Sequence, residues 1–371
     1  MTTHKHLPAL DGIRGLAILI VFVLHFGGGA QSPNPVLRTI GLLIQAGWSG
    51  VTLFFVLSGF LISGILWDGR FGSGWWRNFY MRRTLRIFPL YYGTLLLVFL
   101  TAVAAGRGLF SLSRIWIFAL YLQNIPRLSV KVEDVGSHLW LSHFWSLAVE
   151  EQFYLLWPFL LMRMRSLGQA RTLCLGIFFF SAIFRVAIWY ALPNAGIFSG
   201  FLFTRAGELA IGAYLAMCFR DKTLWLRLQA RAPIVLFVSL ASFLAAGAVG
   251  HSLVLMAPSI FLVGLPCITI FFAALLVIGL SDGVVNRLAC ISWMRWLGGI
   301  SYGVYVFHVL FIPVFAWIVS TIAPHASRNT ALALNFIIAA VLSVLLAWIS
   351  FRFFESPFLK RRIRYKVLQN A

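Results

Sequence analysis

The chain contains the stretch Arg14-Gly-Leu-Ala-Ile-Leu-Ile-Val-Phe-Val-Leu-His25, an apolar run with a cation at one end and an imidazole at the other. Such a run predicts a membrane-spanning helix. Eleven steps of about 100° return to nearly the same helical face, and a rise of about 1.5 Å per residue separates the two groups by roughly 16 Å. Polar groups on one stripe of a spanning helix are costly and indicate function. The alternative is that Arg14 is a flanking topogenic charge and His25 a boundary residue.

The composition indicates an integral membrane protein. Of the 371 residues, 61% are hydrophobic and only 11% are charged. The formal net charge of +20 would indicate nucleic-acid binding in a soluble protein, but here the basic residues stand between long apolar runs. They are typical of topogenic signals and of phosphate-binding sites. We therefore expect the lipid bilayer as a partner, and no nucleic acid. The four cysteines lack the paired spacing of a disulfide framework or a zinc site.

Ten apolar runs have nearly spanning length: 14–30, 47–67, 87–105, 143–163, 172–192, 202–219, 232–250, 261–281, 296–319 and 330–354. If the apolar segment 113–126 does not cross, most basic loop residues fall on one side, which the positive-inside rule assigns to the cytoplasm. We predict an all-α, polytopic membrane protein of about ten transmembrane helices with both termini cytoplasmic. Residues 1–371 would form a single membrane-embedded domain, with 106–142 an outer re-entrant or interfacial segment. Glu355 would stop the last helix and form an ion pair before a short basic cytoplasmic tail, 355–371.

Three arginines, Arg82, Arg83 and Arg86, precede the third apolar run. Arg82 and Arg86 are about one helical turn apart and would share a face. Clustered guanidinium groups at a helix entrance suit phosphate, because the planar fork binds phosphate in a bidentate manner. The alternative is ordinary positive-inside charge with anionic lipid contact.

The fourth apolar run opens with His143 and continues to the adjacent acids Glu150 and Glu151. On an α-helix, His143 and Glu150 would lie two turns apart on one face. Two neighbouring carboxylates in a spanning segment are costly, so at least one should have a function. A histidine and a glutamate on one stripe could supply a general base or orient an acceptor hydroxyl. Alternatively, one acid neutralises a buried arginine such as Arg185 or Arg205.

The later runs add further polar groups. Arg205 and Glu208 stand three residues apart and predict an intrahelical pair. Tyr302, Tyr305 and His308 share a helical face and form either a satisfied polar cluster or a pocket wall; we favour the cluster for Tyr305.

In the second run, Ser58 has no visible base partner, and a nucleophile needs one. A close helix–helix contact is the better interpretation of Ser58 and Gly59.

Taken together, these motifs resemble the acyltransferase-3 family of bacterial membrane acyltransferases. Each motif is weak alone, but the ordered set is specific and covers nearly the whole chain. The matching segments are 10–15 with His25, 54–62, 82–89, 143–158, 205–208, 301–308 and 354–357.

The resemblance implies a ten-helix inner-membrane domain that transfers an acyl group, commonly acetyl, from cytoplasmic acyl-CoA to a hydroxyl of an extracytoplasmic glycan or glycolipid. Acetyl-CoA is thus the expected co-substrate, and no metal is expected. Some members carry a C-terminal SGNH esterase-like domain; this chain lacks one, so we expect direct transfer to the acceptor.

The resemblance also suggests roles for the polar residues. Arg14 and the three arginines before the third run would hold the CoA phosphates. His25 would be a general base on the acceptor hydroxyl or a transient acyl carrier. Glu150 or Glu151 would orient His25, as a carboxylate does in a catalytic triad. An arginine or Tyr302 would stabilise the tetrahedral oxyanion.

Two other classes of function stay open. A glycolipid transporter or flippase could use the same buried His, Glu and Arg groups for proton coupling, but it would release no CoA thiol. A sensing or structural membrane protein with a degenerate site is the other class. The acceptor and the acyl chain length stay open as well.

Overall fold

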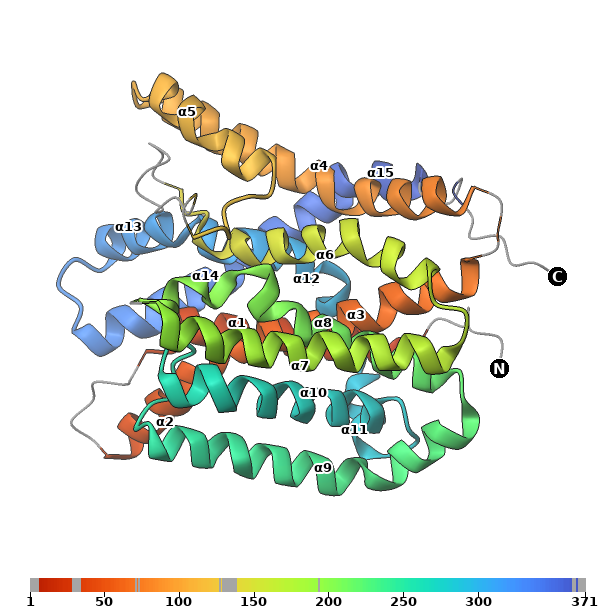
Figure 1. Ribbon diagram of the computed structural model, residues 1–371. Coiled ribbons are helices and arrows are strands. Elements are labelled where there is room, and N and C mark those ends of the chain that lie inside the picture. Colours follow the sequence, from red (N-terminus) through yellow and green to blue (C-terminus); the bar gives the residue numbers. More distant parts are fainter. Residues whose placement is uncertain are drawn as a thin grey trace. The chain divides into compact units, whose positions relative to one another are not determined.

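The computed structural model describes residues 7–28, 35–70, 72, 74–126, 128, 139–192, 194–361 and 365. Most of the predicted basic tail (362–364 and 366–371) and part of the predicted outer segment (127 and 129–138) lie outside the described residues. Within the described part of the chain, every regular element is a helix (Figure 1), which confirms the predicted all-α class.

The α-helices, in chain order, are α1 (Pro8–Phe26), α2 (Pro35–Gln45), α3 (Ser49–Gly69), α4 (Trp75–Ala104), α5 (Gly108–Ala119), α6 (Trp145–Met162), α7 (Leu167–Ala191), α8 (Leu202–Phe219), α9 (Lys222–Val249), α10 (Leu265–Gly279), α11 (Val284–Ala289), α12 (Ser292–Leu310), α13 (Ile312–Ile322), α14 (Arg328–Ile349) and α15 (Ser356–Arg361). Short 3-10 turns are η1 (Ala46–Trp48), η3 (Ser142–Phe144) and η4 (Ala195–Gly200), and π-helical turns are η5 (Ile260–Gly264) and η6 (Ser350–Glu355).

The helices are those of a multi-pass membrane protein. Among the described residues, eight helices are long and apolar enough to cross a bilayer, and α12 with α13, bent by 63°, makes a ninth if the pair is one span. The remaining predicted span corresponds to α6, which has 18 residues but contains the polar run Glu150-Glu151-Gln152. At 12 residues, about 18 Å, α5 is too short to span, as predicted for segment 113–126.

The chain divides into two compact units, each assembled from separate pieces of sequence. Unit 1 contains Met1–Leu24, Gly29–Asp68 and Val149–Gly299, and unit 2 contains His25–Gly28, Gly69–Ala148 and Ile300–Ala371. Each unit therefore depends on packing between segments far apart in the chain. The prediction of a single domain stays a prediction.

In unit 1, small residues let α3 and α8 approach closely. A Cβ atom added to Gly59 would lie 1.9 Å from the carbonyl oxygen of Leu209, and one added to Gly212 would lie 2.0 Å from that of Val56. Small residues at such crossings are typical of membrane helices. This contact confirms the prediction that Gly59 lies at a close helix–helix contact.

In unit 2, the end of α14 differs from the prediction. The helical path does not stop at Glu355 but passes through η6 directly into α15. Glu355 is 6% exposed, and its Oε1 accepts a hydrogen bond of 2.9 Å from the Ser350 hydroxyl. The predicted helix stop is therefore wrong: the carboxylate is satisfied inside the π-helical turn, so nothing ends the helix there.

Candidate active site

Three histidines from distant parts of the sequence meet in unit 2. His25 lies at the end of α1, His143 in η3 and His308 on α12. The ring centroids of His25 and His308 are 5.0 Å apart, and those of His143 and His308 are 5.5 Å apart. His308 is thus the central member of what we call the histidine cluster. The sequence singled out each of these residues, and the fold brings all three together.

Backbone carbonyl groups fix which ring nitrogen carries the proton when two of these rings are neutral. Nδ1 of His308 lies 2.7 Å from the Tyr305 carbonyl oxygen, and Nε2 of His143 lies 3.1 Å from that of Val306. A carbonyl oxygen only accepts hydrogen bonds, so these two ring nitrogens carry the protons. The lone pairs are then on Nε2 of His308 and on Nδ1 of His143. Each ring therefore offers one basic nitrogen.

Hydroxyl groups hold the backbone of His143 in place. The Tyr305 and Ser146 hydroxyl oxygens each lie 3.0 Å from the His143 carbonyl oxygen and also contact each other. Because each hydroxyl has one hydrogen, one donates to the carbonyl oxygen and the other donates to its neighbouring hydroxyl. Tyr305 is thus part of a satisfied polar cluster, as predicted. The sequence-based prediction did not include Ser146. Its position three residues after His143, about one helical turn, would have indicated a contact between the two.

The histidine cluster has a buried part and an accessible end. His308 is fully buried and His143 is 5% exposed, whereas His25 is exposed. A base at the position of His25 can reach a substrate, while His143 and His308 beside it remain shielded from water.

The position of His143 corrects one prediction. His143 precedes α6 in a 3-10 turn and points to α12, so it does not share an α-helical face with Glu150. Glu150 and Glu151 lie on α6, are both half-buried and belong to unit 1. Their predicted action on His25 stays a prediction.

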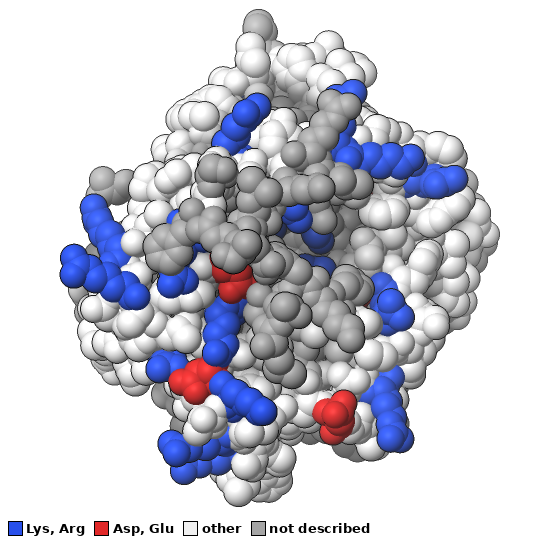
Figure 2. Space-filling model, turned by 90° about the vertical axis from the view of Figure 1, so that its right-hand side faces the viewer, with Lys and Arg blue, Asp and Glu red and all other residues white. Residues whose placement is uncertain are grey.

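The arginines of α4 form a second feature of unit 2. Arg82, Arg83 and Arg86 lie in the first half of α4 and are half-buried. Nη1 of Arg82 donates a 3.1 Å hydrogen bond to the carbonyl oxygen of Tyr365. On the side of the molecule shown in Figure 2, Lys and Arg side chains are frequent and acidic side chains are few. The half-buried guanidinium groups of this α4 segment suit anionic groups.

Helix α12 connects the arginine segment with the histidine cluster. The Tyr302 hydroxyl donates a 2.9 Å hydrogen bond to the carbonyl oxygen of Ile87, directly after Arg86. His308 is six residues further along α12, a rise of about 9 Å. Tyr302 therefore ties α12 to α4 beside the arginines, and it does not lie in the histidine cluster.

Arg14 lies on α1, the same helix as His25, which confirms their common element. Its Nη1 is 3.2 Å from Oδ1 of Asp11, an ion pair of spacing i,i+3. The sequence-based prediction did not include Asp11 as the partner of Arg14, although an acid three residues before an arginine on a helix favours an ion pair. Arg14 belongs to unit 1, so its joint action with the α4 arginines stays a prediction.

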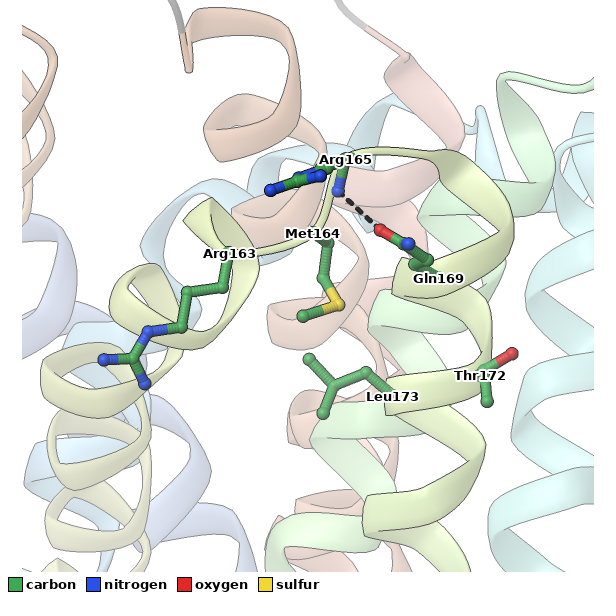
Figure 3. A pocket seen from close by; sticks show the side chains of 6 residues that line it. All are labelled: Arg163, Met164, Arg165, Gln169, Thr172 and Leu173. Carbon is green, nitrogen blue, oxygen red and sulfur yellow. Dashed lines mark hydrogen bonds between the residues drawn. The ribbon is translucent and has the colours of Figure 1, made fainter.

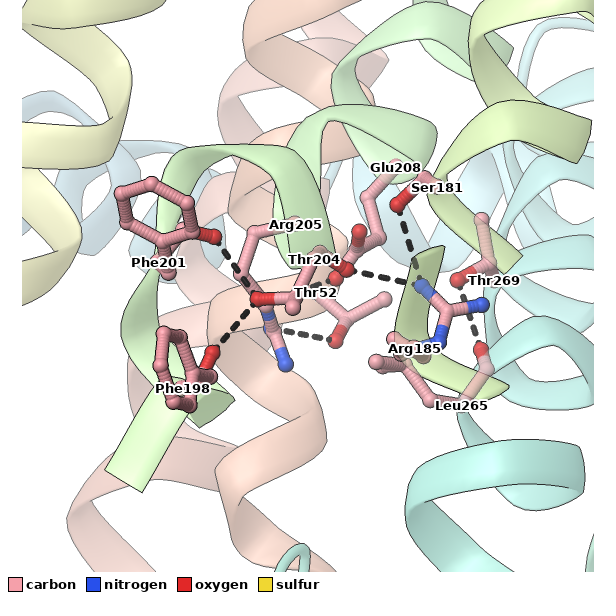
Figure 4. A network of polar contacts seen from close by, with 10 residues as sticks. All are labelled: Thr52, Ser181, Arg185, Phe198, Phe201, Thr204, Arg205, Glu208, Leu265 and Thr269. Atoms are coloured by element: carbon pink, nitrogen blue, oxygen red, sulfur yellow. Dashed lines mark hydrogen bonds and ion pairs between the residues drawn. The ribbon is translucent and has the colours of Figure 1, made fainter. Parts of the chain in front are cut away.

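A separate polar network lies inside unit 1 (Figure 4). Nε of Arg205 is 2.8 Å from Oε1 of Glu208, and both side chains are almost completely buried. Arg205 also donates to the Thr52 hydroxyl, and Arg185 donates to the Thr204 carbonyl oxygen at 2.7 Å. The predicted intrahelical pair is confirmed, so Arg205 has a carboxylate partner on its own helix.

Comparisons with known proteins agree with these features. The chain is 25% identical to the peptidoglycan O-acetyltransferase OatA of Listeria monocytogenes, over 96% of this chain and 56% of that protein. It is 27% identical to the putative peptidoglycan O-acetyltransferase YrhL of Bacillus subtilis, over 95% of this chain and 55% of that protein. It is 26% identical to the O-acetyltransferase OatA of Staphylococcus aureus, over 97% of this chain and 58% of that protein.

The chain thus spans slightly more than half the length of these relatives. The comparison with solved structures gave no significant match. The acyltransferase domain family matches residues 7–352. Because this match covers nearly the whole chain, the protein belongs to the acyltransferase domain family.

Proposed function

We propose that the protein is an O-acyltransferase of the bacterial cytoplasmic membrane. It takes an acyl group, acetyl in the first instance, from acyl-CoA on the cytoplasmic side. It transfers this group to a hydroxyl of an extracytoplasmic glycan or glycolipid. The names of the relatives make a peptidoglycan-type glycan the first acceptor to test. The observation that carries the proposal is the histidine cluster, found in a chain of an acyltransferase family.

In the proposed reaction, His25 acts as the base. Its neutral ring takes the proton of the acceptor hydroxyl while the hydroxyl oxygen attacks the thioester carbonyl carbon. The C–S bond then breaks, and the CoA sulfur leaves as a thiol after it receives a proton. In an alternative route, His25 first takes the acyl group from the thioester and then passes it to the acceptor. Both routes give one ester and one free thiol.

The buried members of the cluster support His25 in either route. His308 is held by the carbonyl groups of Tyr305 and Val304, so its ring cannot turn freely. Its ring is edge-on to that of His25. A fixed neighbour restricts the orientation of the catalytic ring, and correct orientation lowers the barrier of a proton transfer.

The donor, acyl-CoA, would bind beside the arginines. The guanidinium groups of Arg82, Arg83 and Arg86 suit the phosphates of CoA, because each can bind two phosphate oxygens. Arg14 stands roughly 16 Å from His25 along α1. An extended thioester arm is comparable in length with this separation.

The proposal is tested with purified protein in proteoliposomes, given acetyl-labelled acetyl-CoA and soluble peptidoglycan fragments. We expect free CoA thiol and ester-linked acetyl on the glycan in equal amounts. Replacement of the α4 arginines, Arg82→Gln with Arg83→Gln, should raise the KM for acetyl-CoA, whereas the exposed arginine variant Arg295→Gln should not. If label crossed the membrane without release of thiol, the protein would be a transporter and the proposal would be wrong.

A further inference from the structure

A pocket of about 500 Å³ lies in unit 1, where α6 ends and α7 begins (Figure 3). Its lining residues are Arg163, Met164, Arg165, Gln169, Thr172 and Leu173. It contains two cations and no acidic side chain. None of these residues belongs to the histidine cluster or to the α4 arginine segment.

The two arginines of this pocket are available to a ligand. Among the described residues, the side chains of Arg163 and Arg165 have no hydrogen-bond or ion-pair partner, and both are exposed. Arg171 on α7 is different, because its Nη1 lies 3.0 Å from Oδ2 of Asp221. Arg171 is thus paired within the protein, whereas the two pocket arginines have no partner in the part of the chain that the structure describes.

The backbone of the pocket is held by a helix cap. The Ser166 hydroxyl accepts a 3.2 Å hydrogen bond from the Gln169 N–H, and the Gln169 Oε1 accepts one of 2.8 Å from the Arg165 N–H. Reciprocal bonds of this type resemble a capping box and fix the entry of the chain into the helix. The amide nitrogen of Gln169 keeps its own hydrogens for another acceptor.

The other lining groups and the surroundings are apolar. The side chains of Met164 and Leu173 lie between the two helices (Figure 3). Only 22% of an 18-residue apolar segment of α7 is buried inside the protein. Phe159, near the end of α6, is 52% exposed. Surfaces of this kind on spanning helices face lipid chains. The pocket therefore lies where a polar headgroup meets its acyl chains.

We propose that this pocket binds one anionic glycerophospholipid. Its phosphate takes charge-assisted hydrogen bonds from Arg163 and Arg165, Gln169 adds an amide donor, and Leu173 and Met164 contact the start of an acyl chain. Arginine binds phosphate oxygens in a bidentate manner, and basic pockets between membrane helices are suited to lipid headgroups. The α6–α7 turn is predicted to face the cytoplasm, so the lipid belongs to the inner leaflet.

The test compares lipid retention by the whole protein in native mass spectrometry, after exposure to phosphatidylglycerol or to phosphatidylcholine. Wild type should retain one phosphatidylglycerol in preference to phosphatidylcholine. The double variant Arg163→Gln with Arg165→Gln should bind it at least about tenfold more weakly, because two charge-assisted bonds are lost. The matched control, Arg287→Gln with Arg295→Gln, removes the same charge from other exposed positions and should retain the lipid.

Three results would overturn the proposal. Equal weakening in the control variant would mean that general charge attraction holds the lipid. Equal retention of both lipids by wild type would mean that the headgroup is not recognised. Displacement of the lipid by low millimolar inorganic phosphate would make the pocket a site for free phosphate.

Discussion

At the scale of single residues, His308 has two different ring nitrogens. Its Nδ1 is engaged by the carbonyl oxygens of Tyr305 and Val304, and its Nε2 carries the lone pair. The Nδ1 contacts serve the local structure of α12. The Nε2 lone pair is the part of the ring that is available to the cluster, so the two nitrogens can be tested separately.

We predict that His308→Asn and His308→Gln both lower the rate of acyl transfer by about a hundredfold, the typical effect of a misplaced catalytic group. Asn keeps a donor near the Nδ1 position, and Gln keeps a polar atom near the Nε2 position, but neither side chain has the ring that lies edge-on to His25. The measurement is the rate of thiol release, with thermal stability as the control for folding. Full activity of the Gln variant would limit His308 to a hydrogen-bonding role.

The buried pair of Arg205 and Glu208 gives a second prediction at this scale. Glu208→Gln leaves the Arg205 and Arg185 guanidinium groups without their charge partner inside the protein. Removal of one member of a buried ion pair is expected to cost about 3–5 kcal/mol of unfolding free energy. The check is thermal unfolding in detergent, against the variant Asp282→Asn at a surface position. An unchanged melting temperature would contradict the structural role assigned to this pair.

At the scale of elements, close helix crossings depend on particular glycines. Gly59 of α3 faces the backbone of α8, with no space for a Cβ atom. Gly176 of α7 is also inside a helix, but a Cβ atom added there would meet no neighbour within 4 Å. The two positions form a natural pair for comparison.

Gly59→Ala should destabilise the protein by about 1–3 kcal/mol or more, because the added Cβ overlaps a backbone oxygen that cannot turn away. Gly176→Ala should be neutral or stabilising by up to about 1 kcal/mol, because alanine is the better helix former. Both values come from thermal or denaturant unfolding. Equal effects of the two substitutions would show that the α3–α8 crossing is looser than described.

The start of α9 gives a pH-dependent prediction. Asp221 accepts a 3.1 Å hydrogen bond from the Leu224 N–H and a 3.0 Å bond from Arg171. The hydrogen bond from the Leu224 N–H is the larger cause, and the bond from Arg171 the next, of a pKa of Asp221 below its ordinary value. A carboxyl group whose pKa is lower in the folded state stabilises that state above its ordinary pKa of about 3.9 and loses this effect as the pH falls through the lowered value.

Asp221→Asn should therefore reduce stability at neutral pH and have progressively less effect as the medium becomes acid. Asparagine is an equally good N-cap, so the comparison isolates the charge. The measurement is the difference in melting temperature between wild type and variant across that pH range. A difference that grew on acidification would contradict the assignment.

At the scale of the whole molecule, the sequence was enough for the class of fold and for most helices. Apolar runs of spanning length are a direct consequence of the bilayer as solvent, so their positions could be predicted without knowledge of the packing. The end of α14 could not, because Ser350 satisfies Glu355 only when a π-helical turn places the two together.

The sequence identified the members of the histidine cluster, but it did not predict their arrangement. His25, His143 and His308 stand out as polar groups in apolar surroundings, but no periodicity relates segments so far apart in the chain. The contact of His143 with α12 rather than with Glu150 depends on the 3-10 turn before α6. Helical spacing describes one element at a time, so it missed this turn and the meeting of the three rings.

The central claim is that His25 is the chemical centre of an acyl-CoA-dependent transferase. It is tested most directly by the release of free CoA thiol from acetyl-CoA by wild type and His25→Ala in proteoliposomes with a glycan acceptor. We predict steady thiol release by wild type and its loss in the folded variant. Equal release by the two proteins would remove His25 from the reaction and contradict the account.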